Sequence, residues 1–242
     1  MSAAHPRAVV CLPTYEEHEN LEPMLRALGE VLGPSDRVLV IDDNSPDGTG
    51  AIADRLAAEL SFVDVLHRER KEGLGRAYIA GFRIALDRGA ELVLELDCDF
   101  SHDPKDVPRL IEAAGSADLV LGSRYVAGGG VRDWGLVRKL ISRAASLYTR
   151  LLLMPVKDST GGFKCFRREV LERLDLDAIT SRGYMFQIET TYRARRAGFR
   201  VVEIPITFSD REVGGSKMSH SIVAEAIWKV PALRLASLRG RL

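Results

Sequence analysis

Glu91-Leu92-Val93-Leu94-Glu95-Leu96-Asp97-Cys98-Asp99 is the stretch of this chain that decides its fold. Its first six residues are mostly apolar and long enough for a buried strand, which is typical of a parallel sheet. In open sheets of that kind, ligands bind beyond the carboxyl ends of the strands. Asp97 and Asp99 stand at that end, one residue apart, and their charges repel each other unless a cation lies between them.

Two explanations of the aspartate pair are open at this stage. A hard divalent ion such as Mg²⁺ or Mn²⁺ would bind the two carboxylates together with oxygens of a bound diphosphate. The alternative is a solvated loop after the strand, where aspartate is common. The pair alone does not decide between a metal site and a loop.

Short apolar, β-branched runs alternate with segments of helix length on both sides of this stretch. A β-α-β series of this kind predicts an α/β fold with a mostly parallel sheet and helices on both faces. The expected strands are residues 8–12, 37–41, 63–67, 91–96 and 118–121. The expected helices are residues 17–32, 48–60, 73–88 and 104–114.

The composition limits the possible functions. The chain has 242 residues, and its 34 Lys and Arg balance 34 Asp and Glu, so nothing favours a general nucleic-acid binder. Cys11, Cys98 and Cys165 lack the paired spacing of a zinc site and indicate reduced thiols in a cytosolic protein. Without an apolar leader or a run of 18 apolar residues, the sequence predicts neither a secreted nor a membrane-spanning protein.

Polar residues follow each of the expected strands and should meet at one edge of the sheet. Asp43, after the second strand, can accept hydrogen bonds from a nucleoside, and Tyr15, after the first, can lie against a base. Asp47-Gly48-Thr49 is better explained as a helix N-cap and turn. Neither a G-x-G-x-x-G after the first strand nor a G-x-x-x-x-G-K-[ST] occurs, which disfavours dinucleotide dehydrogenases and P-loop NTPases.

The alternation of short strands and helices ends at Gly128-Gly129-Gly130. Residues 134–153 predict one helix with a wide apolar face, bordered by Lys139, Arg143 and Arg150. Such a helix lies in a membrane interface or packs on a sheet, and both remain open. Arg138 and Ser142, four residues apart, share its polar side and can hold an anion.

Two later segments carry cations. Arg211 and Lys217 bracket a glycine-containing loop that either closes over a diphosphate or is an ordinary charged surface loop. After Glu225 the chain is basic and apolar without a further acid, which favours contact with an anionic lipid surface, although frayed termini look similar. Pro231 is expected to break or kink that last segment.

These motifs stand in a definite order along the chain. They are Pro13-Thr14-Tyr15, Asp42-Asp43, Ser45-Pro46-Asp47-Gly48-Thr49, Gly73-Leu74-Gly75, Ala77-Tyr78, Asp97-x-Asp99, Gly122-Ser123-Arg124-Tyr125, Arg138-Lys139-x-Ile141-Ser142-Arg143, Asp210-Arg211 and Ser216-Lys217. Together they resemble the polyprenol (dolichol) monophosphate mannose synthases of the family 2 glycosyltransferases, over residues 9–217. The resemblance implies a GT-A fold and transfer of mannose from GDP-mannose to a polyprenyl phosphate, with inversion of the anomeric centre.

The resemblance also implies roles on the donor side. The guanosine is expected at Pro13, Tyr15, Glu17, Ile41 and Asp43. The diphosphate and an Mg²⁺ or Mn²⁺ ion are expected along Asp97, Cys98, Asp99 and Ser101, with Asp97, Asp99 and Ser101 as the metal ligands. Arg211 and Lys217 match the loop residues that contact the donor diphosphate.

On the acceptor side, Arg124, Arg138 and Ser142 match the residues that hold the lipid phosphate. Asp99, Arg124 and Glu189 are the expected catalytic residues, with Glu189 and Asp158 near the sugar. The acceptor phosphate is already anionic near neutral pH, so no dedicated base is needed. Positioning and charge stabilisation would then carry the catalysis.

Three positions depart from the family pattern. Glu16 stands where the family usually has asparagine, Cys98 where alanine is common, and Ser101 where many relatives have glutamine. Because Ser101 is short and neutral, direct coordination of the metal by its hydroxyl is doubtful. Asp99 is the better ligand, with water or donor oxygens completing the shell.

The sequence thus predicts a peripheral enzyme on the cytoplasmic face of a membrane. Residues 1–217 would form the catalytic domain, including an interface helix at 134–153, and residues 218–242 a basic amphipathic tail on an anionic membrane surface. A membrane protein that anchors the enzyme is a possible partner, whereas nucleic acid is not. The rival hypotheses are a glucosyltransferase that uses UDP-glucose with the same acceptor and a non-catalytic nucleotide-sugar sensor.

Overall fold

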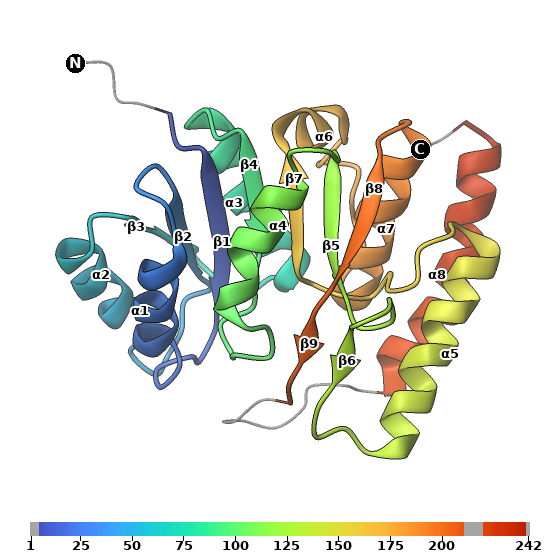
Figure 1. The fold of residues 1–242 in the computed structure, drawn as a ribbon, viewed down its shortest axis with the longest axis horizontal. Helices are drawn as coiled ribbons and strands as arrows, with labels where there is room; N and C mark the ends of the chain where they lie inside the picture. The colour runs from blue at the N-terminus through green and yellow to red at the C-terminus, as the bar shows by residue number, and fades with distance from the viewer. Residues whose placement is uncertain (1–4, 211–219, 241–242) are drawn as a thin grey trace.

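One seven-stranded sheet forms the centre of the computed structural model, which describes residues 5–210 and 220–240, with side chains in the last helix described from Trp228 onward. The strand order is β3-β2-β1-β4-β7-β5-β8, and only β7 runs antiparallel to its neighbours. A small parallel pair, β6 with β9, lies beyond the carboxyl ends of β5 and β8 (Figure 1). The strands are β1 Ala8–Thr14, β2 Arg37–Asp42, β3 Val63–His67, β4 Leu92–Glu95, β5 Leu119–Ser123, β6 Gly130–Val131, β7 Lys164–Arg167, β8 Val201–Pro205 and β9 Thr207–Phe208.

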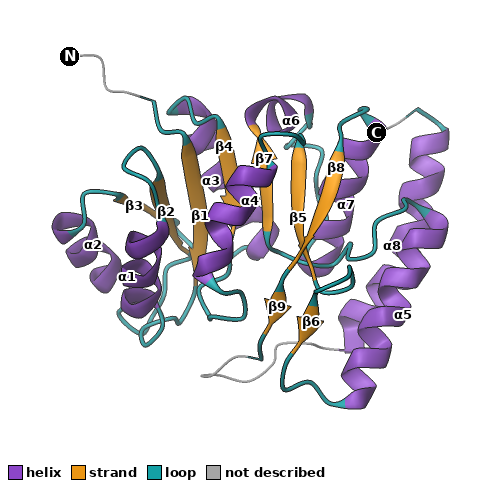
Figure 2. Ribbon diagram, in the orientation of Figure 1, coloured by secondary structure: helices purple, strands orange, loops and turns teal. Residues whose placement is uncertain are grey.

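Helices cover both faces of this sheet, as Figure 2 shows. They are α1 Leu21–Val31, α2 Thr49–Glu59, α3 Leu74–Asp87, the short 3₁₀ turn η1 Pro104–Asp106, α4 Val107–Ala113, α5 Leu136–Leu152, α6 Arg168–Arg173, α7 Gly183–Arg196 and α8 His220–Leu238. Alternate residues of β1 divide the core: Val9 and Cys11 pack toward α3 and α7, while Val10 and Leu12 pack toward α1, α2 and α4. The strands are therefore buried on both faces, as their apolar runs predict.

The predicted α/β architecture is confirmed, and the differences have local causes. Residues 17–20 precede α1 as a turn, and the helix expected at 104–114 divides into η1 and α4. Sequence reasoning missed β7 altogether, because Lys164-Cys165-Phe166-Arg167 is short and carries charges at both ends. Its pairing with β4 and β5 inserts one antiparallel strand into an otherwise parallel sheet.

Two long helices, α5 and α8, lie side by side beyond β8 (Figure 1). Along α5, seven apolar side chains are exposed, with exposed fractions from 38% to 79%: Leu136, Val137, Leu140, Ile141, Leu147, Leu151 and Leu152. Trp228 of α8 is 80% exposed, whereas Val230 and Leu233 belong to the core. Within the described residues, no helix combines the length and apolar character that crossing a bilayer requires.

Of the break or kink expected at Pro231, the break is wrong, since α8 continues through the proline. Pro231 itself is exposed, while its neighbours Val230 and Leu233 are buried against the core. Packing on both sides of the proline thus holds the helix together despite the missing N–H group. The boundary expected between residues 217 and 218 lies outside the described residues.

Candidate active site

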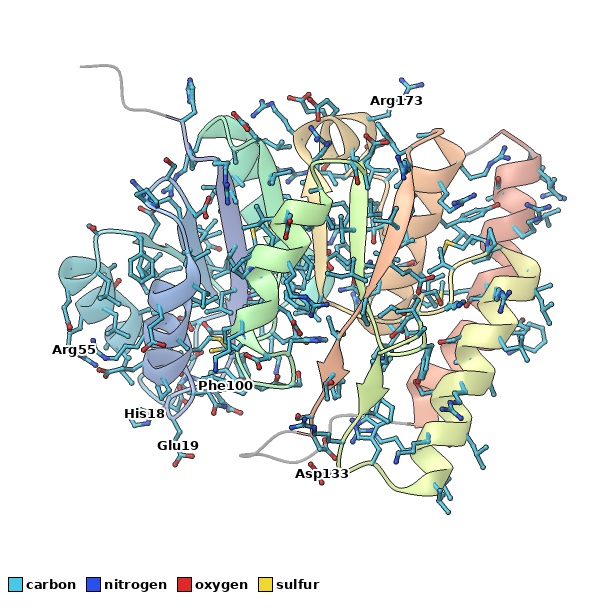
Figure 3. All side chains as sticks on the ribbon, viewed as in Figure 1. His18, Glu19, Arg55, Phe100, Asp133 and Arg173 are labelled. Carbon is cyan, nitrogen blue, oxygen red and sulfur yellow. The ribbon has the colours of Figure 1, made fainter. Side chains whose placement is uncertain are left out.

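A cavity of about 310 Å³ opens at the carboxyl ends of β1, β2, β4 and β5. Its position is the one expected for a ligand site in an open α/β sheet. The cavity brings together these predicted residues from separate parts of the chain: Pro13, Tyr15, Glu17, Asp43, Asp97, Cys98, Asp99, Ser101, Arg124 and Arg138. Figure 3 shows Phe100 at this edge, near His18 and Glu19, with Arg173 at the opposite edge.

The two central aspartates are held by hydrogen bonds from different residues. The Tyr78 hydroxyl donates to Asp97 over 3.1 Å. The Ser101 backbone N–H and hydroxyl both donate to one oxygen of Asp99, over 3.1 and 2.5 Å. Phe100, in the left-handed region at φ 56°, provides the turn that lets Ser101 reach back to Asp99. The local backbone thus fixes the direction of both carboxylates.

The chemistry of this edge fits a hard divalent cation. Asp97 and Asp99 both line the cavity, and carboxylate oxygens are the donor type that Mg²⁺ and Mn²⁺ prefer. Burial raises the pKa of the Cys98 thiol far above its usual range, so Cys98 stays protonated and offers no thiolate. No group of three Asp, Glu, His or Cys side chains is assembled for a metal among the described residues. A ligand or water must therefore complete any coordination shell here.

The end of the cavity near β1 and β2 has an aromatic ring and a carboxylate. The Lys71 ammonium lies 3.4 Å from the centre of the Tyr15 ring. Asp43 pairs with Arg68, yet burial outweighs this pairing and raises the pKa of Asp43. Ile41 does not line the cavity, because its side chain is buried in the core between the sheet and α3. Of the expected guanosine residues, Ile41 can therefore contribute only its backbone.

Arg124 is locked in place at the other end of the cavity. Its Nε and Nη2 donate to the two oxygens of Asp158 over 2.7 and 2.6 Å, and its backbone N–H donates to the same carboxylate over 2.8 Å. Burial would lower the pKa of Arg124, but the charge of Asp158 more than offsets it and raises the pKa. The guanidinium is permanently charged and pre-oriented. Asp158 thus positions Arg124. Asp158 was expected near the sugar, but its carboxylate binds Arg124 and does not line the cavity.

Arg138 and Ser142, expected to act together, have different surroundings. Arg138 lines the cavity, donates to Asp210 over 2.7 Å and lies 4.2 Å from the centre of the Trp134 ring. Ser142 does not line the cavity, and its hydroxyl accepts from the Tyr125 hydroxyl over 2.7 Å. Arg211 and Lys217 lie outside the described residues.

An aromatic cluster that sequence reasoning missed forms one wall. His102 lies 5.0 Å from Phe163 and 5.1 Å from Phe208, and Trp134 lies 5.3 Å from Phe208, ring centre to ring centre. Burial, and then the nearby charge of Arg124, lowers the pKa of His102 to about 4, so the imidazole is neutral at pH 7. These four residues come from four distant segments, so no local sequence signal joins them.

A second missed feature is a buried polar cluster beneath the cavity floor. Lys164 donates from Nζ to the Gln187 carbonyl over 2.8 Å and to the Thr190 hydroxyl over 3.1 Å. Burial raises the pKa of Glu95 to about 7, although the charge of Lys164 opposes the shift. Gln187 lines the cavity above them. The one available signal was Glu95 itself, an acid inside the apolar run that opened the sequence.

Glu189, expected to be catalytic, is not brought to the cavity. It faces away on α7, where one oxygen accepts from Nε and Nη2 of Arg193, both over 2.7 Å. The helical spacing of four residues explains this pairing. Gln187, two residues earlier on the same helix, occupies the position on the cavity wall instead.

Comparisons with known proteins agree with this geometry. The family model described as Glycosyl transferase family 2 matches residues 9–175. An undecaprenyl-phosphate mannosyltransferase from Micrococcus luteus is 51% identical over 241 residues, covering 98% of this chain and 99% of that protein. A polyprenol monophosphomannose synthase from Mycolicibacterium smegmatis is 49% identical over 239 residues, covering 98% of this chain and 89% of that protein.

Solved structures of lower identity share the fold. A mannosyltransferase from Pyrobaculum calidifontis, in complex with GDP-Man and Mn²⁺, matches with a TM-score of 0.63 at 20% identity, over 97% of this chain and 64% of that one. Glucosyl-3-phosphoglycerate synthase from Mycobacterium tuberculosis, in complex with Mn²⁺ and UDP-Glc, matches with a TM-score of 0.64 at 20% identity, over 96% of this chain and 78% of that one. These likenesses, with the sheet order described above, confirm the expected GT-A type of fold. The extent of the family match and the near-complete coverage of both relatives show that this chain belongs to glycosyl transferase family 2.

Proposed function

We propose that this protein transfers mannose from GDP-mannose to a polyprenyl phosphate. The observation that carries the proposal is that one cavity is lined by the aspartate pair, by the fixed guanidinium of Arg124 and by Arg138. A donor diphosphate and an acceptor phosphate both need positive charge close to the reacting carbon. The names of the two close relatives, one from Micrococcus luteus and one from Mycolicibacterium smegmatis, support this pairing of sugar and lipid.

On the donor side, Tyr15 would lie against the guanine, with Asp43, Glu17 and Pro13 around the nucleoside. Asp97 and Asp99 would hold the diphosphate through Mg²⁺ or Mn²⁺, as the Mn²⁺ complexes of two fold neighbours suggest. When bound, the cation would neutralise charge that builds up on the departing GDP. Arg211 and Lys217 remain the proposed loop contacts to the same diphosphate.

On the acceptor side, Arg124 and Arg138 would orient the lipid phosphate, while Ser142 would support them through Tyr125. An oxygen of the acceptor attacks the anomeric carbon as the bond to GDP breaks, which inverts the configuration there. Because the attacking phosphate is already ionised, no side chain has to remove a proton. The fixed ion pair of Arg124 with Asp158 keeps the reorganisation of the site small during the reaction.

The acceptor is a lipid, so the proposed working position is the cytoplasmic face of a membrane. The outward apolar side chains of α5, together with Trp228 of α8, form a surface that suits the membrane interface. Residues 1–217 would then act as the catalytic unit, and residues 218–242 would help it to stay on the lipid surface. A separate anchoring protein remains a possible partner in this proposal.

Incubation of the purified protein with polyprenyl phosphate, Mn²⁺ and one labelled donor tests the proposal. We expect label from GDP-mannose in the organic phase and none from UDP-glucose. Incorporation from UDP-glucose only would replace the mannose claim with the glucosyltransferase alternative. Tight donor binding without turnover, even with lipid acceptor present, would favour the sensor.

A further inference from the structure

A second cavity lies on the other side of Arg124 from the candidate active site. Its volume is about 400 Å³, and it runs between α5 and the loops that follow β5 and α5. Arg143, Ser146, Leu147 and Arg150 contribute the α5 side of the cavity, and Lys157 the opposite side. Nothing in the proposed transfer of mannose uses these five residues.

The charge of this cavity is entirely positive. Arg143, Arg150 and Lys157 are exposed, and none of them forms an ion pair with the described part of the chain. No Asp or Glu side chain from the described ranges lines the cavity. Glu203, which contacts the backbone of Lys157, is already engaged, since it accepts from Ser123 and from the backbone N–H groups of Lys157 and Asp158, each over 2.8 Å. Among the side chains that the structure describes, Arg143, Arg150 and Lys157 therefore have no acidic partner, whereas Arg124, which also lines the cavity, pairs with Asp158.

Ser146 provides an independent sign of a ligand. Its side chain is only 4% exposed, and its hydroxyl has no hydrogen-bond partner among the described residues. Buried hydroxyls are normally paired, because an unpaired one loses its bonds to water without replacement. A ligand atom in the cavity that both accepts from this hydroxyl and carries negative charge would satisfy Ser146 and the cations together.

The surroundings of the cavity indicate what that ligand is. Arg143, Ser146, Leu147 and Arg150 follow helical spacing and share one side of α5. Leu147, one of the exposed apolar side chains of α5, lines the cavity and is itself 54% exposed. A lipid has a phosphate that can bind in the cationic cavity and acyl chains that can contact the neighbouring apolar surface. A free anion would contact only the cavity.

We propose that this cavity binds the phosphate headgroup of an anionic glycerophospholipid, separately from the acceptor lipid. The inference rests on the proposed function only in assuming that the protein acts at a membrane. A bound headgroup would fix the rotation of α5 on the bilayer and so aim the nearby Arg124 and Arg138 at the lipid layer.

Partitioning onto vesicles tests the site. The test variant is Arg150→Gln with Lys157→Gln, and the matched control, Arg173→Gln with Arg195→Gln, removes two exposed cations elsewhere. On phosphatidylcholine vesicles that contain phosphatidylglycerol, we expect the test variant to lose about 30-fold in partitioning, at the usual contribution of each cation near an anionic surface. The control should match the wild type, and on pure phosphatidylcholine all three proteins should bind equally.

Ser146→Ala separates a built site from diffuse attraction, because it removes no charge. We expect it to weaken partitioning onto the same anionic vesicles about fivefold, the usual effect of one lost hydrogen bond. Full binding by Ser146→Ala, or an equal loss in the Arg173 and Arg195 control, would overturn the proposal. Complete competition by millimolar inorganic phosphate would also overturn it, in favour of a soluble anion.

Turnover with a short, water-soluble prenyl phosphate separates this inference from the proposed function. Without vesicles, the Arg150 and Lys157 variant should turn over as the wild type does. Loss of that turnover would make the cavity part of the acceptor route and contradict a separate lipid site. If no form of the protein turns over GDP-mannose, the proposed function fails, and the vesicle measurements still decide the headgroup site.

Discussion

At the scale of single residues, the aspartate pair combines a local structural role with a proposed chemical one. Asp97 and Asp99 take hydrogen bonds from Tyr78 and Ser101, respectively, which orient the carboxylates but do not neutralise them. A cation bound by both carboxylates would reduce the repulsion between their charges. The pair therefore suits the proposed role of holding a divalent cation with oxygen ligands.

Asp99→Asn should abolish metal-dependent turnover and leave the fold intact. The amide oxygen can still accept from Ser101, and the repulsion from Asp97 disappears, so the free energy of unfolding should stay within about 1 kcal/mol of the wild type. Turnover over a titration of Mn²⁺, with thermal unfolding alongside, measures both effects. Full activity of Asp99→Asn would contradict the proposed role of Asp99 in binding a metal.

Glu16 stands where the family usually has asparagine, and its backbone conformation leads to a stability prediction. It is exposed and adopts φ 59°, a left-handed conformation that Asn tolerates far better than Glu. Glu16→Asn should raise the free energy of unfolding by about 0.5–1 kcal/mol, measured by urea denaturation. Glu19→Asn, at a nearby exposed position without positive φ, should change it little; an equal gain there would show that backbone strain is not the cause.

His102 should make the protein sensitive to acid. Its pKa in the folded protein is lowered to about 4, so between pH 6.5 and pH 4 the unfolded chain binds a proton that the folded chain does not. Stability should therefore fall over that interval, by up to about 3 kcal/mol from this residue. In His102→Gln this share of the pH dependence should vanish, whereas the exposed His18→Gln should keep it. Identical pH profiles for the wild type and His102→Gln would contradict the assignment.

At the scale of elements, the sequence predicts best where pattern and burial coincide. The strands around Val10, Val40 and Leu94 are apolar runs buried on both faces, and their positions follow directly from the sequence. β7 could not be predicted, because only its place between β4 and β5 makes Lys164 a buried residue. Tertiary pairing, and not local preference, decides that strand.

In helix α8, tertiary packing again outweighs local sequence preference, and this leads to a prediction. Pro231 removes one backbone hydrogen bond, but buried neighbours keep the helix continuous. Because Pro231 is exposed, Pro231→Ala should restore that bond without loss of packing. We expect a gain of about 1–2 kcal/mol in the free energy of unfolding, after the greater entropy of the unfolded chain is taken into account. Ala232→Pro, one residue along, should destabilise the protein; a loss of stability in Pro231→Ala would show that the proline suits its place.

At the scale of the whole molecule, the candidate site could be predicted in outline only. Motifs along the chain identified most of the residues around the cavity, because parallel strands carry their ends to one edge. The wall of His102, Trp134 and Phe208 and the partner of Arg124 depend on contacts between distant segments, so the sequence alone could not supply them. Glu189, which sequence reasoning expected near the sugar, does not line the cavity and pairs with Arg193, a contact that its motif did not indicate.

The central claim is the transfer of mannose from GDP-mannose to a polyprenyl phosphate, with inversion. The most direct measurement is product analysis after incubation of the purified protein with both substrates and Mn²⁺, giving the amounts of GDP and lipid product and the anomeric configuration by NMR. The account predicts one mannosyl polyprenyl phosphate for each GDP released, in the β configuration from the α-linked donor. Release of GDP without the lipid product, or a product of α configuration, would contradict it.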